Sequence, residues 1–483
     1  MDDVNDVEAQ VDTAELIADE HCIGMFGDKR LCRTGMLLYS RILERGTVCM
    51  RRLSDDRATQ RRFHRLLEHP DVTPSEIMRQ GSERTAQAVA GRHVLAIQDT
   101  SEIDFTAHQG RTSGLGGINN SKGSGLLIHP VLVIDADSHA CLGIAHQAAW
   151  VREESDEPKR KRRPIEEKES MRWIDGALMA RKRLRKAAQV TVVADRESDI
   201  YEEWDRIPDQ HTHLLTRARI DRQLEGKGTM FEWLAQQPVM DRRAIDMPAR
   251  AAGKAYKSTG GTRNSARTAH WADMELRYGR VRIKRPQGSK AKQDTIELTV
   301  VEVKESAGTV PTGEQPVHWV LLCTHDVRSV EEAWQIVQWY KDRWQIEQLF
   351  RILKRQGLEL ESSQLEHADD LLKLACIATL AAVRTLQLVN ARDGETGQPA
   401  SDAFDSHEVE VLEKLQDKFQ GKTDKQKNPH VAQSMAWATW TIARLGGWTG
   451  YASEAKPGPI TILHGLQRLD GMVQGWKLAK MWA

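Results

Sequence analysis

The sequence predicts an α/β protein in which a strand-rich centre is flanked by helical regions. Three short apolar runs in the centre, VLAIQD, LLIHPVLVID and VTVVAD, are bounded by polar residues. Such runs are typical of strands in a sheet that is covered on both faces. The first and the third of these runs end on Asp99 and Asp195. A helical pattern carrying many arginines covers about 23–90, and helical patterns return at 369–392 and beyond.

The chain is too long for one simple core, so its 483 residues predict two or three domains. Its formal net charge of +0 at first argues against a nucleic-acid-binding protein. The charge is segregated, however, because residues 1–20 carry eight acids and no base. Residues 242–292 carry 14 Lys/Arg against three Asp/Glu. The zero is therefore an average over unlike parts of the chain.

The cysteine pattern and hydropathy indicate a soluble cytoplasmic protein without a membrane partner. The six cysteines form no Cys-x2-Cys pair and have no histidine at zinc spacing. Free thiols suit a reducing compartment. No run approaches 18 apolar residues, and the acidic start of the chain is unlike a secretory signal.

A third acid, Glu347, lies in the segment WYKDRWQIEQLFRILKRQ (339–356), which is predicted to be helical. On one helix face it is accompanied by Tyr340, Arg343, Arg351 and Lys354. The simpler interpretation is an amphipathic helix with Arg–Glu pairs on its wet face.

Each strand-end aspartate, taken alone, is more often a strand terminator or a helix cap. Together, two strand-end aspartates and a helix-borne glutamate can share two divalent cations for phosphoryl transfer. Oxygen ligands favour Mg²⁺, for which Mn²⁺ can substitute. We therefore expect Asp99, Asp195 and Glu347 to be the catalytic and metal-binding residues, with two ions per active site.

The spacing Tyr-x2-Arg-x3-Glu-x6-Lys is met in full by Tyr340, Arg343, Glu347 and Lys354. The chain thereby resembles the bacterial cut-and-paste DDE transposases of the YREK-signature insertion-sequence family, which includes the transposase of transposon five. The resemblance covers nearly the whole chain. Its other segments are AIQDT (96–100), ADRESDI (194–200), GDKRLCR (27–33), RFHRLLEHPDV (62–72) and TIARLGGW (441–448).

The resemblance implies a ribonuclease H-like catalytic core, and the predicted strand–hairpin–helix–strand order fits one. It assigns residues 1–75 to a helical DNA-end-binding domain and 76–392 to the catalytic domain. A β-rich insertion is expected at about 219–330, where short alternating runs delay the next helix. Residues 393–483 are expected to form a helical dimerisation domain.

The resemblance also implies the activity and the partners. The enzyme would bind the inverted repeats at transposon ends, nick the DNA, form and open a hairpin, and join the 3′-OH ends to target DNA. Two subunits would act in the paired-end complex. The residues expected to bind DNA are Arg30, Arg62, Arg217, Trp319, Tyr340, Arg343, Trp344, Arg351 and Lys354.

Several alternatives remain open from the sequence. Trp319 can be a strand core residue and Trp344 an edge of helix packing. A nuclease that cuts without joining would use the same core, and a catalytically inactive repressor derived from a transposase would keep only DNA binding. The helix at about 460–481 has Leu463, Leu466, Leu469 and Val473 on one face. By itself this pattern favours folding back on its own domain, whereas the resemblance implies pairing of subunits.

Overall fold

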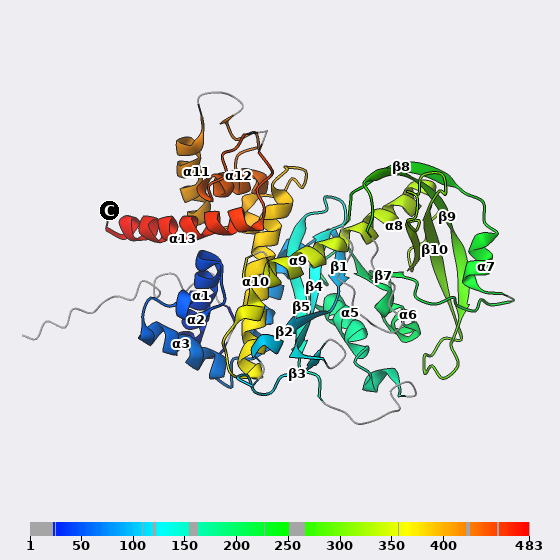
Figure 1. The fold of residues 1–483 in the computed structure, drawn as a ribbon, viewed down its shortest axis with the longest axis horizontal. Helices are drawn as coiled ribbons and strands as arrows, with labels where there is room; N and C mark the ends of the chain where they lie inside the picture. Colours follow the sequence, from blue (N-terminus) through cyan, green and yellow to red (C-terminus); the bar gives the residue numbers. More distant parts are fainter. Residues whose placement is uncertain are drawn as a thin grey trace, which may run out of the picture.

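The computed structural model describes residues 23–482, apart from 25, 109, 119–121, 154–162, 227, 251–265, 356, 422–425 and 452–453. The acidic segment 1–20 and most of the basic loop 253–270 therefore lie outside the described residues. Helices from both ends of the chain lie at one end of the molecule (Figure 1). The strands lie in the middle and extend to the other end (Figure 1).

A mixed sheet of 11 strands runs through the molecule in the order β2-β4-β1-β6-β7-β11-β10-β9-β8, with β3 and β5 also paired to β4. Strands β1 (His93–Gln98), β6 (Gln189–Ala194) and β7 (Thr212–Arg217) are parallel. The other strands of the central part are β2 (Ser101–Asp104), β3 (Gly116–Ile118), β4 (Gly123–Asp135) and β5 (Cys141–Trp150). This mixed α/β sheet is consistent with the expected ribonuclease H-like core.

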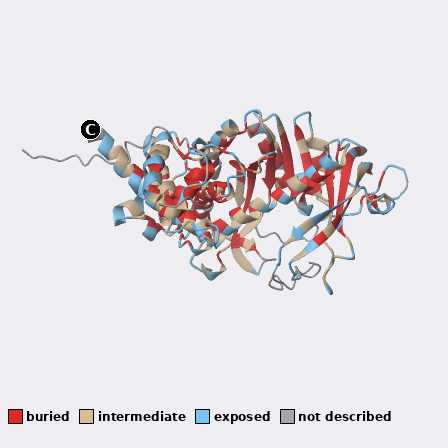
Figure 2. Cartoon of the chain, turned by 90° about the horizontal axis from the view of Figure 1, so that it is seen from above, coloured by how far each residue is buried: buried red, intermediate tan, exposed pale blue. Residues whose placement is uncertain are grey.

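Alternate residues of the central strands enter two separate cores, one on each face of the sheet. On β1, Leu95 and Ile97 pack in one core, while Val94 and Ala96 pack in the other. Helices α5 (Met171–Arg183) and α6 (Tyr201–Arg206) contribute to the second core. Figure 2 shows the buried residues running through the strands and into the helical end. Burial on both faces explains why these runs are apolar without alternation.

The strands of residues 219–330, where the sequence predicts a β-rich insertion, continue the central sheet. It contains α7 (Met230–Ala235), β8 (Asp241–Met247), β9 (His270–Lys284), β10 (Thr295–Glu305) and β11 (His318–Cys323). Only three residue pairs join β11 to β7, from Leu321↔Arg217 to Cys323↔Leu215. The long β9–β10 ladder then carries the sheet outward to the edge strand β8.

Four helices precede the sheet, namely α1 (Lys29–Arg45), α2 (Met50–Leu53), α3 (Arg57–Glu68) and α4 (Pro74–Ala88). Side chains that cap the first turns explain where three of them begin. Asp28, Asp56 and Thr73 accept hydrogen bonds from the backbone N–H groups at the starts of α1, α3 and α4. Gly46 ends α1 in the left-handed conformation, with φ 56°.

The segment that carries Glu347 is not one continuous helix. Helix α8 (Val330–Asp342) and helix α9 (Trp344–Lys354) meet at Arg343. Around this residue the backbone makes the tighter bonds Arg343 N to Tyr340 O (3.3 Å) and Ile346 N to Arg343 O (3.2 Å). Our expectation of a single helix over 339–356 was therefore wrong, and Tyr340 and Glu347 are carried by different helices.

Helix α10 (Ala368–Ala391) packs on the sheet and contacts helices from both ends of the chain. Of the described helices, it alone is long and apolar enough by composition to cross a membrane. The protein itself buries 83% of its apolar window, as is usual for a core helix. The sequence had indicated no apolar run of that length, but an 18-residue window of mean hydropathy 1.6 occurs here.

The chain ends in helices α11 (Ser406–Phe419), α12 (Met435–Leu445) and α13 (Pro459–Trp482). Leu463, Leu466, Leu469 and Val473 of α13 are each no more than 5% exposed. Helix α13 packs against α1, α10, α11 and α12, which explains this burial. This apolar face folds back on its own chain, so the expectation that these four residues form a dimer patch was wrong.

Candidate active site

Asp99 and Asp195 occupy equivalent places after two adjacent parallel strands. In the β1–β6 ladder, Ile97 pairs with Val193, and each aspartate follows two residues later. Neighbouring strands lie about 4.8 Å apart, so the two carboxylates leave the same edge of the sheet side by side. The Asp195 carboxylate also caps a short 3-10 turn, η5 (Arg196–Ser198), by accepting from Glu197 N at 2.8 Å.

Arg343 connects the third acid to the first. Its Nη1 lies 3.1 Å from Asp99 Oδ2, and its Nη2 lies 3.0 Å from Glu347 Oε1. The interruption between α8 and α9 falls at this residue. Its guanidinium connects Asp99, which follows the end of β1, with Glu347 on α9. The structure thus brings Asp99, Asp195, Glu347 and Arg343 together, as the sequence predicted.

Burial and neighbouring negative charge raise the pKa of Asp99 to about 7. Burial is the largest cause, followed by the Asp195 charge, while Arg343 acts in the opposite direction. Glu347 raises the pKa further. A carboxyl group held in this way signals a concentration of negative charge that one guanidinium does not neutralise.

This acidic centre fits the chemistry of Mg²⁺ or Mn²⁺. All its donor atoms are carboxylate oxygens, which these ions prefer, and the charges of Asp195 and Glu347 add to burial in raising the pKa of Asp99. Within the described ranges, no three His, Cys, Asp or Glu side chains are grouped closely enough to hold one ion. Mg²⁺ commonly takes only one or two protein carboxylates and completes its shell with water and phosphate oxygens, so paired acids suffice.

Aromatic and basic side chains adjoin the acids on the insertion side. The rings of Trp319 and Tyr340 meet edge to face with centroids 5.4 Å apart. The Arg343 guanidinium lies 5.8 Å from the Tyr340 ring. Burial raises the pKa of Tyr340, whereas the charges of Arg343 and Arg217 lower it. Arg217, whose Nη2 donates to His318 O at 3.0 Å, therefore belongs to the same group of side chains.

Three further residues of α9 that were expected to bind DNA have contacts away from the acids. Trp344 is 47% exposed, and the Arg351 guanidinium lies 5.9 Å from its ring. Lys354 donates to Glu102 O of β2 and lies 3.6 Å from Glu361 Oε1. Burial lowers the pKa of Lys354. Lys354 is held between β2 and the segment after α9, and its recorded contacts do not include the three acids.

The two candidate DNA contacts near the start of the chain are exposed and distant from the acids in the fold. Arg30 lies in the first turn of α1, and Arg62 lies on α3. In Figure 1 these helices lie across α10 from the central strands. The structure does not bring them into the acidic centre.

Sequence reasoning missed Arg172, which lies on α5 beside both aspartate loops. Its Nε donates to Thr100 Oγ1 at 2.7 Å, and its Nη2 donates to Glu197 Oε2 at 2.9 Å. The Asp195 charge also acts on it. Arg172 stands in a helix with several other cations, and nothing in its spacing distinguishes it from them.

A family comparison agrees with this geometry. Residues 174–384 match the family described as Transposase DDE domain. The central part of the chain is thus similar to a transposase DDE domain. The domains of this family are enzymes that cut and transfer DNA strands. The matched DDE domain includes Asp195 and Glu347, whereas Asp99 precedes it.

Among solved structures, the chain is similar to a cryo-EM structure of the piggyBac transposase synaptic complex with hairpin DNA. The similarity covers 79% of this chain and 76% of that chain, at 12% identity and a TM-score of 0.34.

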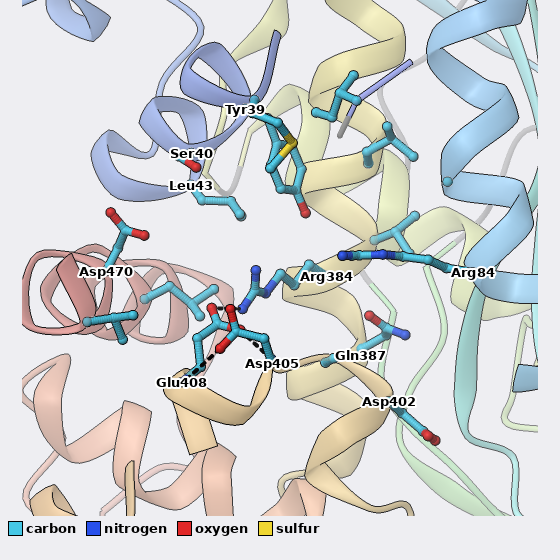
Figure 3. Close-up of a pocket in the computed structure, with 18 of the residues that line it drawn as sticks. Tyr39, Ser40, Leu43, Arg84, Arg384, Gln387, Asp402, Asp405, Glu408 and Asp470 are labelled. Carbon is cyan, nitrogen blue, oxygen red and sulfur yellow. Dashed lines mark hydrogen bonds and ion pairs between the residues drawn. The ribbon is translucent and has the colours of Figure 1, made fainter. Parts of the chain in front are cut away.

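A cavity of about 680 Å³ lies away from the acidic centre, where α1, α4, α10, α11 and α13 meet. Figure 3 shows side chains of these helices pointing into it, among them Arg384, which is paired with Glu408 at 2.6 Å. Four Arg/Lys and four Asp/Glu line the cavity. This balance of charge does not favour a polyanion, so the cavity is no candidate for the DNA-binding site.

Proposed function

We propose that this chain is a cut-and-paste transposase that binds inverted repeats at transposon ends, excises the element and joins its 3′-OH ends to target DNA. The observation that carries the proposal is the geometry of Asp99 and Asp195 after adjacent parallel strands, with Glu347 tied to Asp99 through Arg343. The DDE domain match supports the same chemistry.

Asp99, Asp195 and Glu347 would hold two Mg²⁺ ions, for which Mn²⁺ can substitute. When bound, such ions lower the pKa of a water or 3′-hydroxyl and stabilise the leaving oxygen. The acids supply negative charge in fixed positions. Arg343 pairs with Asp99 and Glu347 in the protein described here, and its guanidinium can donate hydrogen bonds to a DNA phosphate when the acids receive cations.

Trp319, Tyr340 and Arg217 form the side of the site that would receive the terminal nucleotides. A hairpin forces a base out of the stack, and a half-buried indole offers a surface on which it can stack. Arg217 and Arg343 supply two cations beside that surface for the flanking phosphate. Trp344 and Arg351, which lie on the exposed face of α9, would contact the DNA outside the site.

The test is excision of a DNA fragment flanked by the element's inverted repeats, followed on a denaturing gel with Mg²⁺, with Mn²⁺ and with EDTA. We expect metal-dependent nicks, then hairpins, then joined products. Asp195→Asn and Glu347→Gln should each lower cleavage about a thousandfold, equivalent to about 4 kcal/mol of transition-state stabilisation, while end binding persists. Near-normal cleavage by either variant would contradict the assignment of the acids.

The same assay separates the alternatives. A nuclease on the same core would give nicks without joined products, and an inactive repressor would bind the ends without cutting them. Since the acids of the DDE domain are intact, we expect both nicking and joining.

We propose further that two copies act together on two ends. The leucine face of α13 is buried, so a contact between copies through this helix would use its exposed residues. Met472, which is 42% exposed, is one of them. Met472→Asp should therefore reduce two-end complexes on native gels while single-end binding persists. Ile460→Asp is the matched control, at an exposed position one residue into the same helix. Undiminished two-end complexes with Met472→Asp would exclude this face as the contact.

A further inference from the structure

A chain of buried polar side chains connects the two aspartate loops beneath the acidic centre. Gln98, His129 and Ser198 are 0% exposed, and Glu203 is 1% exposed. Gln98 immediately precedes the first catalytic aspartate, and Ser198 closes the turn that the second one caps. His129 comes from β4 and Glu203 from α6, so four separate elements meet in this chain.

The hydrogen bonds of the chain are continuous. Ser198 Oγ donates to Glu203 Oε2 at 2.5 Å, and Gln98 Nε2 donates to Glu203 Oε1 at 3.4 Å. Gln98 Oε1 lies 3.1 Å from His129 Nε2. His129 Nδ1 lies 2.9 Å from Thr100 Oγ1. His129 therefore holds the residues on both sides of Asp99, one with each ring nitrogen.

The donors and acceptors fix one direction for the whole chain. Because Gln98 Oε1 can only accept, His129 Nε2 must carry the proton, and His129 Nδ1 must accept from the Thr100 hydroxyl. That hydroxyl oxygen in turn accepts from Arg172 Nε at 2.7 Å. Burial keeps the pKa of His129 well below its ordinary value, so the ring is neutral as this arrangement requires. Glu203 ends the chain, with Oε2 beside Ser198 Oγ and Oε1 accepting from Gln98 Nε2.

The sequence retains two locally unfavourable residues here. Burial, together with the negative charge of Asp199, raises the pKa of Glu203 to about 8, although the hydrogen bond from Ser198 acts in the opposite direction. Apolar residues of similar volume commonly stabilise a core as well as such a group does, or better. Gly176 lies inside α5, where glycine costs about 0.5–1 kcal/mol relative to alanine. A Cβ at this position would stand 2.4 Å from Gln98 Oε1, so the helix has space for the Gln98 amide only with glycine.

We propose that Glu203 and His129 are positioning residues that set the placement of Asp99 relative to Asp195 for binding the catalytic cations. The inference rests on the proposed function, and it adds to that function a role for side chains outside the acidic centre. His129 fixes the backbone on either side of Asp99. Glu203 ties Gln98 to the turn of Asp195. Replacing Glu203 should therefore alter the positions of both aspartates, although Glu203 contacts neither of them.

The test measures Mn²⁺ binding to the full-length protein without DNA, from the electron paramagnetic resonance signal of free Mn²⁺. Glu203→Gln should weaken Mn²⁺ binding about tenfold to a hundredfold, the usual effect of losing a partner that orients metal ligands. At pH 9, above the pKa of Glu203, the melting temperature of the variant should be equal to or above that of the wild type, because a buried charge is removed. The matched control is Glu202→Gln, the same change one residue earlier. Glu202 accepts from Ser289 Oγ at 2.6 Å and stands outside the chain.

A reciprocal exchange tests the direction of the hydrogen bonds. In the double variant Gln98→Glu with Glu203→Gln, the acid and the amide trade places, and every donor again meets an acceptor. We expect Mn²⁺ affinity to recover toward the wild-type value. A weakened Glu203→Gln without recovery in the double variant would show that the order of donors and acceptors does not set the Mn²⁺ affinity, and it would overturn the positioning role.

Different results would overturn the proposed function and the positioning role. If the wild-type protein binds no Mn²⁺, the proposed function fails and the positioning role fails with it. If the wild type binds Mn²⁺ and Glu203→Gln binds it equally well, only the positioning role is overturned.

Discussion

Asp99 should destabilise the metal-free protein at neutral and higher pH, so replacing it with Asn should raise the melting temperature under those conditions. Its pKa in the folded protein is about 7, against an ordinary value of 3.8. A folded-state pKa above the unfolded value means that the unfolded chain ionises more readily. Stability is therefore lost as the pH rises from about 4 to about 7, and the full cost remains at higher pH.

The difference of about three pKa units corresponds to about 4 kcal/mol at pH 8, at 1.36 kcal/mol per unit. The Asp99 side chain is 21% exposed, so solvent screening reduces this value only partly. Unfolding entropy of about 2.1 cal/mol/K per residue over 483 residues converts 4 kcal/mol into a shift of about 4 °C. Asp99→Asn should thus melt up to about 4 °C above wild type in EDTA at pH 8.

The assay is thermal unfolding by circular dichroism, in EDTA, at pH 4 and at pH 8. The difference between Asp99→Asn and wild type should be present at pH 8 and absent at pH 4. Asp417→Asn, which alters an exposed acid on α11, controls for a general effect of lost charge. Adding Mn²⁺ should raise the melting temperature of wild type more than that of the variant. Equal stability of the two proteins at pH 8 would refute the argument that burial and the neighbouring acids make ionised Asp99 unfavourable in the folded protein.

Two other changes give equally definite expectations. Trp319→Ala should spare the first nick and slow hairpin formation by about tenfold to a hundredfold, since stacking contributes about 1–3 kcal/mol. An abasic site at the flipped position should partly restore the rate, and equal loss at every step would indicate a purely structural tryptophan. Burial and Glu44 raise the pKa of Asp470 to about 8, and Gln474 Nε2 donates to both acids. Asp470→Asn should therefore make the protein more stable above pH 8 and leave it unchanged near pH 4. Urea unfolding at the two pH values checks this, and a variant less stable at high pH would contradict it.

The acidic centre could be predicted because each acid has a local signal. Asp99 and Asp195 end apolar runs, and parallel pairing makes equivalent positions neighbours in space. Glu347 has its place in a spaced signature. The role of Arg343 as a bridge could not be predicted, because the break between α8 and α9 occurs within a pattern that is helical throughout.

The sequence could predict neither the hydrogen-bonded chain of buried polar side chains nor the packing partner of α13, for different reasons. His129 stands within the apolar run LLIHPVLVID, and that anomaly was the available signal, but its partners come from three other elements. The leucine spacing of α13 predicts an apolar face but does not indicate which element packs against it. Either another helix of the same chain or a second copy satisfies the same pattern, and the fold selected the former.

The β7–β11 ladder is short, since Leu321↔Arg217, Leu322↔Thr216 and Cys323↔Leu215 are its three residue pairs. Side-chain packing reinforces it, because both hydrophobic cores continue from the central strands into β9 and β10. Helix α8 contacts β6 and β7 on one side of this ladder and β9 and β10 on the other. Tyr340 on α8 and Trp319 on β11 are therefore fixed to both parts of the sheet, so that the aromatic pair and the strands behind the aspartates belong to one packed unit.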